Sequence, residues 1–191
     1  MSVWHVVAGI GLSLLCGCET LKLGTALRYS QLEVEDIVPS EARVAVALPP
    51  SFVDKTDITV EVMITEDEVI VTDERFDLVV LETSAERQAL PSAARRANAT
   101  VFALNRSDIE PAQRVMARYA AGAPAEVRSW KLAWSVSVEA DDLDRTTVCA
   151  VTDARLVIWT KPSTDLGYRQ LTRRVRLGDL IEQAEEGACD G

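Results

Sequence analysis

The chain has 191 residues, which suits one domain with a hydrophobic core of ordinary size. It carries 30 acidic residues against 20 Lys and Arg, so its formal net charge is −10. Nucleic-acid binding depends on basic residues that neutralise phosphates, and we therefore expect no nucleic-acid partner.

The first predicted element is an apolar segment over residues 6–15, VVAGIGLSLL. Its length is that of a signal-peptide core, and it falls short of the roughly 20 apolar residues that span a membrane. The segment ends in Leu15-Cys16-Gly17-Cys18. This motif resembles the lipobox of bacterial lipoproteins, in which the last cysteine receives the lipid. The resemblance implies that residues 1–17 are removed as a lipoprotein signal peptide and that diacylated Cys18 anchors the protein to a membrane.

The same resemblance implies a place in the cell envelope. In lipoproteins of enteric bacteria, Asp after the lipidated cysteine favours the inner membrane, and here that residue is Glu19. We therefore expect the outer membrane, with the protein facing the periplasm. Residues 18–40 are expected to form a lipidated N-terminus and tether, and residues 41–191 a single β-rich periplasmic domain. Outside the lipobox, the chain loosely resembles small periplasmic lipoproteins of proteobacteria, and this likeness supplies no further motif.

From residue 42 onward, apolar and polar residues alternate with the period of two that half-buried strands show. The predicted strands cover residues 44–48, 58–64, 69–71, 76–81, 100–104, 130–138, 148–159 and 168–175. Asp73-Glu74 predicts a polar turn after the third of these. Val79 and Leu81 are apolar next to the alternating face of the fourth, which predicts burial on both faces. The segment 148–159 is either two strands or one bent strand interrupted near Asp153.

Two helices are predicted among the strands. Ser107 and Glu110 fit a capping box at the start of a helix over 108–121, and Gly122 fits its end. Its apolar stripe consists of Ile109, Ala112, Met116 and Tyr119. The second helix is predicted near 177–185. The expected fold is mainly β, or α+β: an antiparallel β-sandwich or open barrel, with one packed helix near 108–121 and a C-terminal helix near 177–185.

The residues that support catalysis are scarce. His5 is the only histidine, and cleavage after Gly17 would remove it. The mature protein would then hold no Ser-His-Asp or Cys-His arrangement and no His-containing zinc site. Lys131 beside Ser129 or Ser135 leaves a Ser-Lys dyad open, although nothing in the spacing favours it. We expect no catalytic residue and no cofactor.

An acidic loop offers the hard oxygen ligands that calcium prefers. It consists of Asp141, Asp142 and Asp144. The spacing fits no EF-hand and the glycine of the sharp turn is absent, so we expect a solvated loop and no metal. The segment from Thr65 to Glu68 is interpreted as a turn for the same reason.

The four cysteines are Cys16, Cys18, Cys149 and Cys189. Removal of Cys16 and lipidation of Cys18 would leave Cys149 and Cys189, and two cysteines in an oxidising compartment usually pair. A Cys149–Cys189 disulfide would stabilise the fold by about 3–4 kcal/mol and hold the C-terminal segment on the sheet. The alternative is two free thiols.

Two further groups of residues are candidate binding surfaces. Arg169, Arg173, Arg174 and Arg176 form a basic run in an acidic chain and could bind an anionic glycan, lipid or protein. Ion pairs with acidic residues of neighbouring strands explain the same run. Trp130, Trp134, Trp159 and Tyr168 could form a platform for a ligand, but Trp130 and Trp134 alternate as core residues do.

These patterns predict a non-catalytic binding or scaffolding module attached to the membrane through the lipid on Cys18. Its partner would be an envelope protein or an anionic glycan or lipid. A periplasmic carrier or chaperone for an apolar ligand, opened under the helix at 108–121, is the first alternative. A hydrolase that works without histidine is the second.

Overall fold

The computed structural model describes residues 20–25, 36–53, 56–141, 149–151, 153–171 and 175–177. Its strands are β1 (Thr20–Thr25), β2 (Arg43–Ala47), β3 (Thr56–Glu66), β4 (Val69–Val80), β5 (Thr100–Leu104), β6 (Trp130–Asp141), β7 (Arg155–Lys161), β8 (Arg169–Gln170) and β9 (Val175–Arg176). Its helices are α1 (Pro50–Val53), α2 (Ser84–Ala89), α3 (Ser92–Arg96) and α4 (Ile109–Ala120).

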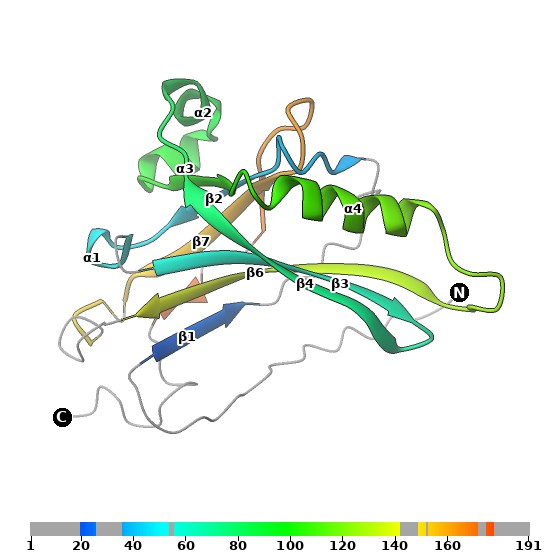
Figure 1. Ribbon diagram of the computed structural model, residues 1–191. Coiled ribbons are helices and arrows are strands. Elements are labelled where there is room, and N and C mark those ends of the chain that lie inside the picture. The colour runs from blue at the N-terminus through cyan, green and yellow to red at the C-terminus, as the bar shows by residue number, and fades with distance from the viewer. Residues whose placement is uncertain are drawn as a thin grey trace, which may run out of the picture.

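The strands of this part of the chain form one antiparallel sheet in the order β1-β6-β3-β4-β5-β2-β7-β8, with β9 beside β7. Strand β4 joins its two halves, because residues 69–77 pair with β3 whereas residues 78–80 pair with β5. The sheet therefore curls into a half-barrel (Figure 1). The predicted mainly β, antiparallel open architecture is confirmed.

The alternation of β3 and β6 determines which side chains enter the half-barrel. Ile58 and Ile64 of β3 and Val136 and Val138 of β6 are buried on the inner face. Toward one end of these strands, this face packs against Val44, Val46 and Ile158 of the β2–β7 half. Toward the other end it packs against α4. Two core clusters thus share one continuous concave surface.

Helix α4 lies across the half-barrel (Figure 1) and confirms the helix predicted over 108–121. Ala112 and Val115 are buried against β3 and β4, and Gly122 takes φ +88° just after the helix, as a C-terminal glycine does. The predicted capping box is wrong. Asp108 occupies the cap position. Its carboxylate accepts hydrogen bonds from the Ser107 hydroxyl and from the Asp77 amide.

The outer face of β2 is covered as well. Ala45 and Ala47 point away from the half-barrel and pack with Trp159, Leu90 and Ala94. Leu90 and Ala94 belong to the α2–α3 segment between β4 and β5, which the alternation analysis missed. The sequence does carry a helix-start signal there, because the Thr83 hydroxyl accepts the amide of Glu86 in a Thr-x-x-Glu pattern.

Two predictions for the residues of β4 are wrong. The turn lies at Asp67 and Glu68, both with positive φ, as predicted for the acidic segment that ends at Glu68. Asp73-Glu74 forms no turn, because these residues continue β4 and pair with Met63 and Val62. The predicted burial on both faces near Val79 is also wrong, since Val79 and Val80 are exposed.

The remaining segments differ in detail from the sequence expectations. Among the described residues of the predicted strand region 148–159, Cys149 lies in a helical turn and the strand is β7. Among the described residues of the region 168–175, β8 and β9 are separate short strands, and Leu171 belongs to neither. Leu177 is fully buried, while the rest of the predicted helix near 177–185 lies outside the described residues.

Part of the expected tether joins the sheet. Residues 20–25 form β1 and pair along β6. The Val38 amide donates to the Pro162 carbonyl at 3.0 Å, so residues 36–42 lie beside the end of β7. Among the described helices, none has both the length and the apolar character needed to span a membrane.

Candidate functional site

An apolar pocket lies inside the half-barrel at the junction of the two core clusters. Its wall includes Val60 and Val62 of β3, Leu104 of β5, Ala112 and Met116 of α4, and Trp134 of β6. The pocket holds a volume of about 80 Å³, is partly open to solvent and is walled almost entirely by apolar atoms. It lies beside α4, the helix under which the alternative carrier hypothesis expected an opening.

The pocket lies where the two core clusters meet. Val60 and Trp134 each pack against both clusters, so they bridge the part of the face between the β2–β7 half and α4. At this point α4 presents Ala112, whose side chain is small. Trp134 is a half-buried core residue, as predicted, and it also contributes to the pocket wall.

Three polar residues belong to this wall: Arg43, Thr160 and Lys161. Thr160 is 3% exposed, and its hydroxyl has no hydrogen-bond partner within the described part of the chain. The register pairs Thr160 with Val44, and residues opposite each other share a face of the sheet. Thr160 therefore lies on the concave face with the pocket.

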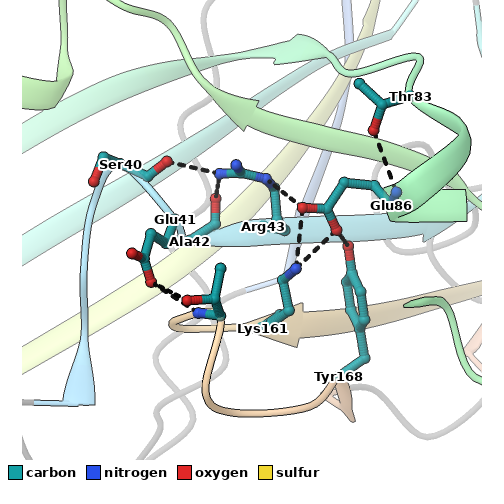
Figure 2. Close-up of polar contacts among 9 residues, drawn as sticks. Ser40, Glu41, Ala42, Arg43, Thr83, Glu86, Lys161 and Tyr168 are labelled. Carbon is teal, nitrogen blue, oxygen red and sulfur yellow. Dashed lines mark hydrogen bonds and ion pairs between the residues drawn. The ribbon is translucent and has the colours of Figure 1, made fainter. Parts of the chain in front are cut away.

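The residues just before Val44 and just after Thr160 take part in a polar cluster on the opposite face. Figure 2 shows the Glu86 carboxylate held between Arg43, Lys161 and Tyr168. Arg43 Nε lies 3.2 Å from Oε1, Lys161 Nζ lies 3.0 Å from Oε1 and 2.8 Å from Oε2, and Tyr168 Oη lies 3.2 Å from Oε2. We call these four residues the Glu86 cluster. It attaches α2 to β2, β7 and the segment before β8.

The charges in the Glu86 cluster compensate for its burial. Burial favours the neutral form of Glu86, but the hydrogen bond and charge of Lys161 and the charge of Arg43 outweigh it, so the pKa of Glu86 is lowered. Burial and the negative charge of Glu86 raise the pKa of the Tyr168 phenol. Lys161 Nζ also lies 5.3 Å from the centroid of the Tyr168 ring. This cluster has satisfied partners and acts as a structural connection.

The other predicted aromatic residues serve the core. Trp130 stacks on Tyr119 with ring centroids 5.8 Å apart, and its indole N–H donates to the Tyr119 carbonyl. Trp159 is buried on the outer face of β7. These contacts attach the end of α4 and the α2–α3 segment, which agrees with the core interpretation.

The predicted arginine surface is only partly described. Arg169 pairs with Thr160, and Arg176 pairs with Arg155, so the register places Arg169 and Arg176 on opposite faces of the sheet. Both are exposed, and Arg176 lies 3.9 Å from the Asp153 carboxylate. Arg173 and Arg174 lie outside the described residues.

Cys149 is engaged in a disulfide bond. Cys189, its predicted partner, lies outside the described residues, as do Cys16, Cys18 and His5. The pairing of Cys149 with Cys189 therefore stays a prediction, and so does lipidation of Cys18.

The structure describes some of the residues considered for catalysis and metal binding. Ser135 is buried and its hydroxyl lies 3.4 Å from the Glu61 carboxylate, whereas Lys131 is exposed. Asp142 and Asp144 lie outside the described residues. In the part of the chain that the structure covers, no group of three or more His, Cys, Asp or Glu side chains could hold a metal ion.

A second, open groove of about 540 Å³ lies between α3 and β7. Its wall includes Ala93, Ala97, Arg155 and Gln170.

Known protein families, curated proteins and solved structures give no match to this chain.

Proposed function

We propose that this protein is a non-catalytic lipoprotein of the cell envelope whose β-rich domain binds an apolar ligand in the pocket under α4. The lipid on Cys18 would hold it at the outer membrane, facing the periplasm, as the lipobox implies. The observation that carries the binding proposal is the apolar pocket itself. A carrier needs interior space for its ligand, whereas a scaffold presents its outer surface, so this pocket favours the carrier over the scaffold.

The character of the wall indicates the kind of ligand. Protein interiors are normally packed to the density of organic crystals, so an apolar space at the junction of two clusters offers contacts to a ligand. An engineered apolar cavity of about 150 Å³ binds benzene. The pocket has about half this volume, roughly 80 Å³, which suits part of a straight aliphatic chain better than a ring.

The proposal is tested on the chain from residue 18 to 191 made without its lipid, since every described residue lies in this range. We expect six-carbon alkyl compounds to bind, with a change in the fluorescence of Trp134, which contributes to the wall. Isothermal titration calorimetry gives the dissociation constants. Failure of every six-carbon compound to bind would refute the proposal.

A substitution in the wall locates the binding. Ala112→Leu extends a larger side chain from α4 into the pocket and should weaken binding at least tenfold, because the ligand loses space for two or more methylenes. Ala117→Leu changes the exposed face of the same helix and is the matched control. If Ala112→Leu disturbs the circular dichroism spectrum, Met116→Phe provides a second variant of the wall. Equal binding by a folded wall variant and the control would place the ligand elsewhere.

A further inference from the structure

The Thr160 hydroxyl is a buried polar group without a partner among the described residues. Burying a hydroxyl without a hydrogen bond is unfavourable, and nearly all buried polar groups in folded proteins have a partner. The backbone of Thr160 pairs with Val44 in the β2–β7 ladder, so the side-chain hydroxyl is what this residue can offer to a ligand. Thr160 belongs to the pocket wall, whose other polar residues, Arg43 and Lys161, direct their charged groups to Glu86.

The charges around Thr160 indicate which chemical groups of a ligand it could bind. The cations next to the Val44–Thr160 pair are Arg43 and Lys161, and Figure 2 shows both directed to Glu86 on the opposite face. Arg43 and Lys161 also belong to the pocket wall, but their charged groups contact Glu86, and the exposed wall is almost entirely apolar. A carboxylate or phosphate buried at Thr160 would have to draw one of these cations away from Glu86 or stay unpaired, and either is unfavourable. An uncharged oxygen needs one hydrogen bond, which a hydroxyl provides.

We infer that the ligand is an uncharged amphiphile, a straight aliphatic chain carrying one hydrogen-bonding oxygen such as an alcohol, ketone or ester, and that Thr160 binds this oxygen. This inference rests on the proposed function and adds the ligand class and the residue that selects it. The chain occupies the space beside Val60, Met116 and Trp134. Thr160 is a specificity-determining residue of this site.

The protein contains its own control for this inference. Thr59 is 2% exposed and its hydroxyl also lacks a partner in the described part of the chain. The register pairs Thr59 with Ser137 and Asp77, and alternation along β3 places it on the face opposite Val60. It does not belong to the pocket wall. Thr59→Val and Thr160→Val therefore remove the same chemical group with the same burial, one outside the pocket and one in it.

The test measures binding of 1-hexanol, 1-chlorohexane and hexanoate at pH 7 to the wild type, Thr160→Val, Thr160→Ser and Thr59→Val. We expect Thr160→Val to weaken 1-hexanol about fivefold to tenfold, the value of one hydrogen bond, and to leave 1-chlorohexane unchanged. Thr160→Ser should retain the affinity for 1-hexanol, and Thr59→Val should affect neither compound. Hexanoate should bind the wild type at least tenfold more weakly than 1-hexanol.

The outcomes distinguish failure of this inference from failure of the proposed function. If Thr160→Val weakens 1-hexanol and 1-chlorohexane equally, or neither, the role of Thr160 is overturned while the pocket remains a binding site. If hexanoate binds as tightly as 1-hexanol, the uncharged ligand class is overturned. If no compound binds the wild type, the proposed function fails, and this inference fails with it.

Discussion

The Glu86 cluster allows a prediction whose size and pH dependence both follow from its geometry. The Glu86 carboxylate accepts hydrogen bonds from Arg43, Lys161 and Tyr168, and its side chain is only 14% exposed. Removing one partner of a buried ion pair costs about 3–5 kcal/mol. Since Arg43 retains some contact with solvent, we expect Glu86→Ala to lower the free energy of unfolding by about 3 kcal/mol. Glu86→Gln keeps the shape but removes the charge, and should lose about half of this.

The lowered pKa of Glu86 gives the pH dependence of this effect. When pH falls below the ordinary value of 4.5, the unfolded state takes up a proton before the folded state does. The stabilisation is therefore present above about pH 4.5 and is lost as pH falls through the folded-state pKa. Urea unfolding of the wild type and Glu86→Gln at pH 7 and at lower pH should show a difference that shrinks with acidification.

The control for this experiment is an exposed carboxylate in an ion pair. Glu110 lies 2.7 Å from Arg114 on α4, with side chains 82% and 65% exposed. Glu110→Gln should stay within about 0.5 kcal/mol of the wild type. If Glu86→Gln unfolds at the same urea concentration as Glu110→Gln at pH 7, the Glu86 cluster does not stabilise the fold as argued.

Two other substitutions test separate parts of the chain. Glu68 has φ +76° in the β3–β4 turn, so Glu68→Gly should raise the free energy of unfolding by about 0.5–1 kcal/mol in urea; a lower stability would show that the turn is not strained. Cys18→Ala should move the protein from the membrane fraction to the soluble fraction when cells are fractionated. Retention of the variant in membranes would contradict a lipid anchor on this cysteine.

Alternation along the chain predicted the elements that have one buried face. Ile58 and Ile64 in β3 and Val136 in β6 are buried as their spacing indicates, because a strand with one solvated face repeats every two residues. The stripe that includes Ala112 predicted α4 for the corresponding reason.

The failures have identifiable physical causes. Asp73 and Glu74 are exposed and pair with β3, and a solvated strand surface accepts the same polar residues as a turn. The helices α2 and α3 contain six and five residues, too short for an apolar period to appear. The start of α2 was signalled by Thr83 and Glu86.

The candidate site was harder to predict than the fold. Only the alternative carrier hypothesis expected an opening under α4. The pocket depends on the distance between Ala112 and Val60 across the half-barrel, which is a tertiary property. The role of Thr160 follows from its missing partner, and a sequence shows no such absence. The Glu86 cluster likewise joins Glu86 to residues that lie 43 to 82 positions away from it.

The alternation of Thr160 and Lys161 also favours a single register between β7 and β2. A slip of one residue between the two strands would turn the Lys161 ammonium into the apolar pocket and direct the Thr160 hydroxyl toward Glu86. Both exchanges are unfavourable, since the pocket would receive a charge and Glu86 would lose one. The carboxylate on α2 therefore discriminates against misregistered pairing, and β2, a short strand with two valines and two alanines, gains a unique alignment with β7.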